Sequence, residues 1–170
     1  MIRWFLPDDE TYARKAHSVF GFIFDVRHAG GEVWVRDTVA AAAWTPPGGL
    51  RPTTPSVEDR WAALSTELDE DEVERMSEYD DALGALLPTF PTWYLGVLGT
   101  APAHQGQGHG KAVTMPILDR ADQAGEPQSL ETCVAANRAI YESWGFEVTG
   151  EMEPAGGPTV WVMVRQPGGS

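Results

Sequence analysis

A glycine-rich turn between an apolar strand and a helix is the feature of this chain that most constrains its fold. The strand is predicted over residues 93–100. The helix is predicted over residues 110–124, where apolar side chains recur at helical spacing. Gly106, Gly108 and Gly110 alternate in the turn. Glycine allows left-handed backbone angles, and a helix start directs several N–H groups at one point, so the turn is predicted to hold an anion such as phosphate.

Two common phosphate-binding patterns do not fit this turn. The P-loop needs Gly-Lys followed by Ser or Thr, but Gly110 and Lys111 are followed by Ala112. Its first glycine position holds Gln105, and no hydroxyl is placed to hold a magnesium ion. The dinucleotide-binding pattern G-x-G-x-x-G also fails, because its last glycine position falls on Lys111 or Val113.

The pattern that does fit is Gln-Gly-x-Gly-x-Gly after a strand, at residues 105–110. It resembles the coenzyme A pyrophosphate loop of the GCN5-related N-acetyltransferases. Residues 137–146, which follow a predicted strand at 130–134, are similar to the family's Asn-x-x-x-Tyr-x-x-x-Gly-Phe segment. The resemblance runs in order over residues 93–165. It implies an α/β (α+β) fold with a mixed, mostly antiparallel sheet and helices on both faces.

Within this family the chain most resembles the branch of the puromycin N-acetyltransferases, and that likeness reaches forward to about residue 33. Family members usually begin with a strand and a helix ahead of the segment that here starts at Met1. The resemblance therefore implies that the usual first strand and helix are lacking. An exposed sheet edge is prone to pairing, which makes a homodimer a candidate assembly.

The resemblance assigns the coenzyme to backbone groups of the strand and the turn, helped by a few side chains. The backbone of Leu98 is expected to face the thioester oxygen, and Thr100 is expected to support the pantetheine arm. Asn137 is expected to bond the pantetheine amide, or to cap its helix. The residues expected to bind acetyl-CoA are Leu98, Gly99, Thr100, Gln105, Gly106, Gln107, Gly108, His109, Gly110, Lys111 and Asn137.

The resemblance also supplies candidates for the proton transfers. Tyr141 is the candidate general acid for the departing thiolate; the alternative is that it packs in the core beside Trp144. Glu131, on the strand that lines the expected cleft, is the candidate general base. It could instead bind the ammonium group of the acceptor or be a solvated edge residue. Glu151 and Glu153 are further candidates for the base.

Aromatic residues on the predicted strands are candidates for the wall of an acceptor site: Trp44, Trp93 and Tyr94. Aromatic side chains in strands more often belong to the core, so both interpretations stay open. The single cysteine, Cys133, lies on a predicted buried strand and is expected to fill space in the core. The sequence has no spacing typical of metal ligands, so no metal is expected.

The whole sequence predicts one domain over residues 1–166, with a coenzyme-binding core at about 93–165 and a disordered tail at 167–170. A chain of 170 residues with 42% hydrophobic residues can form a packed core. The formal net charge of −13 disfavours nucleic acid and anionic membranes as partners, and mildly favours a cationic amine. Ahead of the turn, the predicted elements are a helix over 9–24, strands over 32–36 and 39–45, and helices that start near Ser56 and Asp69.

The function predicted for the chain is acetyl-CoA-dependent transfer of an acetyl group to a primary amine of a small molecule, by direct attack on the thioester. Acetylation of a protein or peptide is one alternative, and a non-catalytic acyl-CoA-binding module is another. The sequence has no run of about 20 apolar residues and no apolar region at its start typical of a signal peptide. A cytoplasmic location, where acetyl-CoA is available, is therefore expected.

Overall fold

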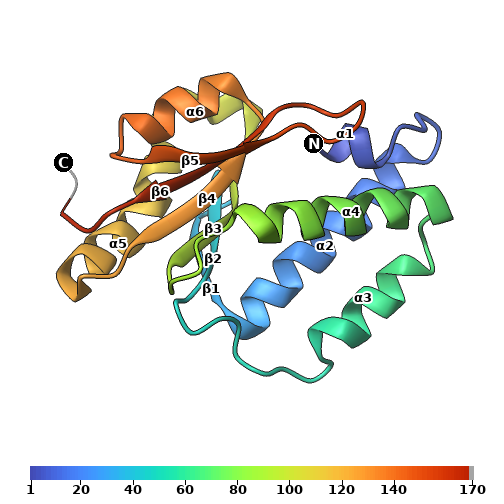
Figure 1. Ribbon diagram of the computed structural model, residues 1–170, viewed down its shortest axis with the longest axis horizontal. Helices are drawn as coiled ribbons and strands as arrows, with labels where there is room; N and C mark the ends of the chain where they lie inside the picture. Colours follow the sequence, from blue (N-terminus) through green and yellow to red (C-terminus); the bar gives the residue numbers. More distant parts are fainter. Residues whose placement is uncertain (169–170) are drawn as a thin grey trace.

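The computed structural model describes residues 1–168, in which helices lie on both faces of a six-stranded sheet (Figure 1). Residues 169 and 170, the end of the tail predicted to be disordered, lie outside the described residues. The elements in chain order are α1 (Ile2–Phe5), α2 (Tyr12–Gly30), β1 (Glu32–Arg36), β2 (Ala40–Thr45), α3 (Val57–Ser65), α4 (Glu70–Leu86), β3 (Trp93–Thr100), η1 (Pro102–His104), α5 (His109–Ala124), β4 (Gln128–Thr132), α6 (Ala135–Glu142), β5 (Glu147–Met152) and β6 (Val160–Arg165).

The strands lie in the order β1-β2-β3-β4-β6-β5. Within residues 1–168, β3 and β4 form the only parallel pair, and every other neighbouring pair is antiparallel. A parallel pair needs a crossover, which α5 provides. The predicted mixed, mostly antiparallel sheet is therefore confirmed, and β1 lies at one edge of it.

Two hydrophobic cores lie on opposite faces of the sheet. The first packs α5 and α6 on the strands and includes Trp44, Ile117 and Phe146. The second packs α1, α2, α3 and α4 and includes Leu6 and Leu83. Successive residues of β6 alternate between the two cores because side chains of a strand point to opposite faces. Both faces of the sheet are thus covered by helices, as the family resemblance implied.

A buried ion pair joins α2 to α4. Lys15 Nζ donates to Asp69 Oδ2 at 2.7 Å and to Glu72 Oε2 at 2.6 Å, and Lys15 and Glu72 are each only 2% exposed. Glu72 Oε2 also accepts the Asp69 backbone N–H at 2.8 Å, which completes the start of α4. The contact fixes the spacing of the two helices that flank the candidate site. Within residues 1–168, none of the helices combines the length and hydrophobicity needed to cross a membrane.

Candidate active site

The parallel strands β3 and β4 are paired at one end and separate at the other. Their register runs from Trp93 opposite Gln128 to Leu95 opposite Leu130, and ends there. Beyond that point β3 stays beside β2, whereas β4 stays beside β6. The space that widens between β3 and β4 is called the wedge here. On the side of β3 that faces it, the backbone groups of residues 96–100 pair with no strand within the described residues. An extended ligand can bind along such an edge by backbone hydrogen bonds.

A β-bulge lies at the closed end of this wedge, where β3 begins to separate from β4. On β2, Ala43 is opposite Val97 and Trp44 is opposite Leu95, so Gly96 has no counterpart. A bulge bends its strand and increases the local twist, and bulges are frequent beside active sites. The bulge at Gly96 therefore accounts for the separation of β3 from β4 immediately after their last pair.

Arg27 of α2 packs against this bulge. A Cβ atom built on Gly96 would lie 2.2 Å from Arg27 Nε, so any other residue at this position would force the guanidinium group to shift. Arg27 Nη1 donates to the Ile23 carbonyl at 3.3 Å, and Nε is buried without a hydrogen-bond partner in residues 1–168. The guanidinium carbon lies 5.7 Å from the centre of the Tyr94 ring. Arg27 thus brings a positive charge to the closed end of the wedge, near Tyr94.

The glycine-rich turn at the end of β3 has the geometry of an anion cradle. Gly106 and Gly108 have φ angles of 73° and 79°, in the left-handed region that glycine adopts without strain. Gly108 caps α5, so the N–H groups of its first turn have no acceptor within the helix. A Cβ on Gly110 would come within 3.3 Å of Thr100 Oγ1, so glycine there allows helix and strand to approach closely. These features fit the pyrophosphate of a coenzyme.

The side chains of the turn mostly brace the turn itself. Gln105 Nε2 donates to the Thr100 carbonyl at 3.2 Å, and Gln107 Nε2 donates to the Ala103 carbonyl at 3.3 Å. The His109 ring meets the His104 ring edge-on, with centroids 5.9 Å apart. Lys111 is exposed on the first turn of α5. The binding role expected of this segment therefore rests on its backbone N–H groups.

Glu131 and Tyr94 meet at the closed end of the wedge. The Tyr94 hydroxyl donates to Glu131 Oε2 at 2.5 Å. Burial raises the pKa of the Glu131 carboxyl, whereas the hydrogen bond from Tyr94 and the charge of Arg27 act to lower it. A carboxylate with a raised pKa is a stronger base at neutral pH than an exposed one, so the site suits proton abstraction.

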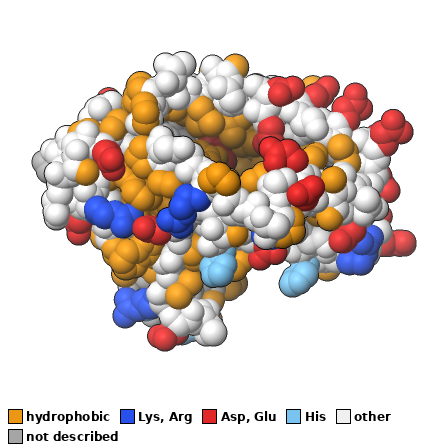
Figure 2. Space-filling view, turned by 90° about the horizontal axis from the view of Figure 1, so that it is seen from below, with side chains coloured by type: hydrophobic (Ala, Val, Ile, Leu, Met, Phe, Trp, Pro, Cys, Tyr) orange, Lys and Arg blue, Asp and Glu red, His pale blue; other side chains and the backbone are white. Residues whose placement is uncertain are grey.

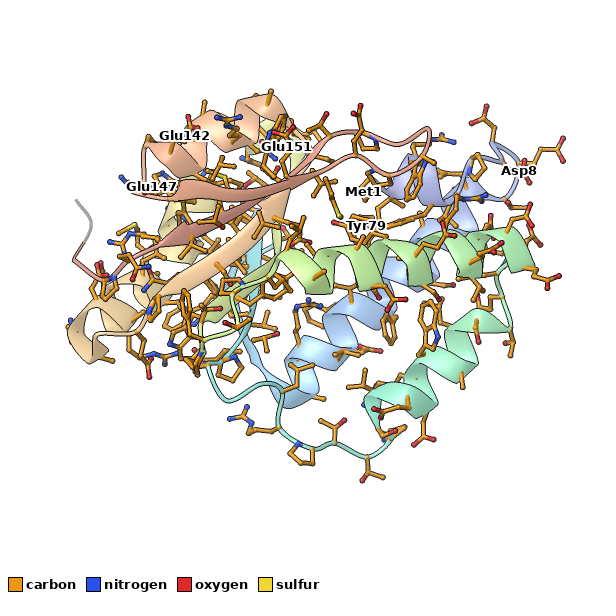
Figure 3. All side chains as sticks on the ribbon, in the orientation of Figure 1. Met1, Asp8, Tyr79, Glu142, Glu147 and Glu151 are labelled. Carbon is orange, nitrogen blue, oxygen red and sulfur yellow. The ribbon has the colours of Figure 1, made fainter. Side chains whose placement is uncertain are left out.

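Two more tyrosines lie within electrostatic range of this carboxylate. Burial raises the pKa of Tyr141 to about 12, and the charge of Glu131 adds to the rise. Burial and then Glu131 likewise raise the pKa of Tyr79, which lies between α4 and the strands in Figure 3. Asp80 is the next residue on α4. Burial raises the pKa of its carboxyl group, and the charge of Arg27 acts to lower it. Glu131 therefore influences the pKa values of tyrosines on both α4 and α6.

Tyr141, the candidate proton donor, packs in the core with its ring against two other aromatic side chains. It is 7% exposed and packs edge-on against Trp144 and Phe146, with ring centroids 5.5 and 6.1 Å away. No residue among 1–168 forms a hydrogen bond with its hydroxyl. Its packing in the core and a catalytic role are thus compatible, because the ring is held and the hydroxyl is left for a ligand.

Three other predicted site residues lie away from the Tyr94–Glu131 pair: Trp44, Trp93 and Asn137. Trp44 is completely buried, and the Trp93 indole N–H donates to Glu126 Oε2 at 2.6 Å in the same core. The two tryptophans face α5, so they belong to the core, which was the alternative left open for them; of the three aromatic candidates only Tyr94 remains for the acceptor wall. Asn137 is exposed in the first turn of α6, where Val134 is the N-cap and no side chain caps the helix. Its alternative role as a cap is therefore wrong.

The remaining acidic candidates lie on the surface. Glu151 Oε2 accepts the Trp161 indole N–H at 2.8 Å, and Glu153 is exposed. Cys133 is half-buried against the second core, and its Sγ accepts a hydrogen bond from the Met1 ammonium group at 3.4 Å. Among the described residues, His, Cys, Asp and Glu side chains nowhere gather in a group of three that could hold a metal ion.

Sequence reasoning missed Arg27, Tyr79 and Asp80. These residues come from α2 and α4, whose sequences carry no local motif. One signal was available, because an isolated glycine inside a strand indicates a bulge or a close approach of another group. Gly96 shows both, and the group that approaches it is Arg27.

Comparison with known proteins shows which sequences and which fold this chain is similar to. No protein-family model matches the chain. An uncharacterised N-acetyltransferase of Schizosaccharomyces pombe is 40% identical over 55 residues, which are 32% of this chain and 22% of that protein. The match thus spans about a fifth of the curated relative.

The structural comparison covers much more of the chain. A Corynebacterium glutamicum protein described as histone acetyltransferase HPA2 and related acetyltransferase superimposes with a TM-score of 0.64, at 21% identity, over 95% of this chain and 78% of that one. This superposition shows that the two proteins share a fold. The chain has the fold of the GCN5-related N-acetyltransferases, which confirms the resemblance inferred from its motifs.

Proposed function

We propose that this chain is an acetyl-CoA-dependent N-acetyltransferase that acetylates a primary amine of a small molecule. The observation that carries the proposal is the wedge between β3 and β4, with a glycine cradle at its open end and the Tyr94–Glu131 pair at its closed end. One continuous strand edge connects an anion site to a buried base. A long ligand with a phosphorylated head and a reactive tail matches that arrangement.

In this proposal the coenzyme is held mainly by backbone groups. The N–H groups at the start of α5 would bind the pyrophosphate. Residues 96–100 would bond the pantetheine arm, with the Leu98 backbone facing the thioester oxygen, and Asn137 would contact the arm from α6. Lys111 would add positive charge beside the phosphates. The bound coenzyme supplies the acetyl group as a thioester.

Glu131 and Tyr141 would carry the two proton transfers. Glu131 would take a proton from the ammonium group of the acceptor, directly or through water. The freed amine nitrogen would bond to the thioester carbon, the carbon–sulfur bond would break, and the second proton of the nitrogen would pass through water to reprotonate Tyr141 after it has protonated the thiolate. Tyr141 would then give its proton to the departing thiolate, because a phenol with a pKa of about 12 stays protonated at neutral pH. No covalent enzyme intermediate is formed.

The charge of the site indicates a cationic acceptor. Glu131 lies inside the wedge and Asp80 lies on the adjacent helix, in a chain whose formal net charge is −13. Figure 2 shows that one face of the molecule is hollowed, with hydrophobic side chains around the opening, acidic side chains on one side of it and basic side chains on the other. Such surroundings attract an ammonium group attached to an apolar body. A cytoplasmic location, with access to acetyl-CoA, belongs to the same proposal.

Coenzyme binding is tested by the melting temperature with and without acetyl-CoA. At about 100 times its dissociation constant, the ligand should add about 2.7 kcal/mol to the free energy of unfolding. Gly108→Ala should reduce this shift. Gly125→Ala is the matched control, because Gly125 caps the other end of α5 with a φ angle of 69°. Both variants carry the same backbone strain, so an equal loss of the shift would contradict the cradle.

Catalysis is tested by thiol release from acetyl-CoA against a panel of small amines and short peptides. We expect turnover with amines that carry an apolar body, and loss of turnover in Glu131→Gln while the acetyl-CoA melting shift is kept. Turnover with peptides alone would replace the small-molecule acceptor with a protein acceptor. A melting shift without turnover against any acceptor would indicate a non-catalytic acyl-CoA-binding module.

A further inference from the structure

The outer edge of β1 is unprotected. In residues 1–168, β1 pairs with β2 alone, so its other side presents free backbone N–H and C=O groups. Trp34 is 38% exposed and Val35 is 62% exposed. Natural proteins blunt such edges with lysine, proline or a bulge, because an open edge pairs with other chains. The segment Glu32–Arg36 has none of these, and its pairing with β2 is regular over all five residues.

The sequence of β1 allows favourable side-chain pairs with an antiparallel second copy of the same strand. It reads Glu32, Val33, Trp34, Val35, Arg36. When two copies lie antiparallel about a two-fold axis at Trp34, each Glu32 faces Arg36 of the other copy. Each Val33 then faces Val35, and the two Trp34 side chains face each other. Opposite charges, β-branched pairs and aromatic pairs are the cross-strand combinations that stabilise antiparallel strands.

From this complementarity we propose that β1 is the interface of a symmetric homodimer, in which two six-stranded sheets join edge to edge. A two-fold axis makes the same patch serve both subunits, so a self-complementary strand is the simplest element that satisfies it. This assembly goes beyond the proposed acetyl transfer, because none of its contacts involves the coenzyme cradle or Glu131.

The charged side chains at the two ends of β1, Glu32 and Arg36, are placed where such a contact would need them. Glu32 is held by α5, where Arg120 Nη1 donates to Glu32 Oε1 at 3.0 Å. The Trp34 indole N–H also donates to Glu32 Oε2, at 3.3 Å. Glu32 therefore has a fixed position at the edge. Arg36 is exposed and forms no ion pair within residues 1–168, and Glu32 of a second copy would give it one.

The oligomeric state of the whole chain tests the proposal, by sedimentation equilibrium from about 1 to about 300 µM. We expect a dimer to form over this range. Glu32→Arg and Arg36→Glu should each raise the dimer dissociation constant at least about tenfold, because like charges then face each other twice. Thr38→Glu, in the turn just after the strand, is the control and should leave the dissociation constant unchanged.

Mixing the two charge variants in equal amounts gives the decisive result. In a mixed pair every charge again faces its opposite, so the mixture should recover the dimer that each variant alone has lost. Melting temperatures show that the variants are folded, and Val35→Lys provides a second disruption that spares Glu32 and its contact with Arg120. A monomeric wild type at the highest concentration would overturn the proposal. So would variants that dimerise as well as the wild type, or a mixture no tighter than its components.

Discussion

The Tyr94 hydroxyl donates to Glu131 across the two strands at the place where they part. Tyr94 is opposite Ser129 in the register, and Glu131 lies two residues further along the same face of β4. The bond is therefore diagonal and spans the closed end of the wedge. It ties the strands together and stabilises the charged form of the carboxylate that we propose as the base.

Loss of this bond should change the pH dependence of the reaction. Tyr94→Phe removes the donor that lowers the pKa of Glu131, so that pKa should rise further above its ordinary value of 4.5. A base with a higher pKa becomes deprotonated at higher pH. The acidic limb of the pH profile of kcat/KM should therefore move to higher pH. Tyr12→Phe, outside the site on α2, should leave the limb in place; an unmoved limb in Tyr94→Phe would argue that Glu131 is not the titrating base.

Glu131 should also make stability depend on pH. Its pKa is raised by burial, so the folded chain binds a proton more tightly than the unfolded chain. The free energy of unfolding should therefore fall as pH rises from about 4.5 through the raised pKa. Glu131→Gln removes this dependence. The melting temperature of the variant relative to the wild type should increase across that window, and a constant difference would show that Glu131 titrates normally.

Replacement of the proposed acid should affect turnover and leave binding intact. Tyr141→Phe keeps the ring that packs on Trp144 and Phe146 and removes only the hydroxyl. We expect kcat to fall about 10²–10⁴-fold, with the melting shift on acetyl-CoA unchanged. Since the pKa of Tyr141 is about 12, any decline of the wild-type rate below about pH 10 should persist in the variant. An unchanged kcat would assign Tyr141 to packing alone.

The contact between Gly96 and Arg27 can be measured by a double-mutant cycle. Gly96→Ala would place a methyl group 2.2 Å from Arg27 Nε, which should cost about 1–3 kcal/mol of unfolding free energy. In an Arg27→Ala background the same change should cost less than about 0.5 kcal/mol, because the clash is gone. Urea unfolding of the four proteins gives the coupling. Equal costs in both backgrounds would mean that the bulge itself, and not the arginine, requires glycine.

The buried Lys15–Glu72 pair should dominate the packing of α2 on α4. Lys15→Met leaves Glu72 charged and buried, which should cost about 3–5 kcal/mol. The double replacement Lys15→Met with Glu72→Leu removes both charges and should recover most of that loss. Denaturant unfolding measures both. A single variant as stable as the wild type would show that Asp69 and Glu72 are hydrated when Lys15 is absent.

Local sequence pattern predicted the strand and the helix on either side of the glycine-rich turn closely. The strand over residues 93–100 is exactly β3, and α5 starts one residue earlier than expected because Gly108, and not a later residue, caps it. Glycine spacing and helical periodicity are short-range signals, and here no tertiary contact overrides them. Glu131, Tyr94 and Tyr141 were each predicted singly, although not the hydrogen bond between two of them, which depends on strand register.

The acceptor half of the site depends on contacts between distant segments. The helix predicted over residues 9–24 extends to Gly30, and the added turn carries Arg27 onto the bulge. Packing against the sheet stabilises that turn, and no local pattern encodes it. The sequence left Trp44 open between the core and the acceptor wall for a related reason. Strand alternation predicts two faces, and only the positions of the helices show which face is covered.

The division of the molecule into two cores has a consequence for how the proposed enzyme could diversify. Helix α5, with the glycine cradle, is anchored in one core, whereas α2 and α4, which carry Arg27 and Asp80, are anchored in the other. Substitutions in the second core can reshape the acceptor wall while the sheet shields the coenzyme cradle from their strain. Selection for a new acceptor can therefore act on one side of the sheet, and a library confined to α2 and α4 would explore new substrates without sacrificing the shared acetyl donor.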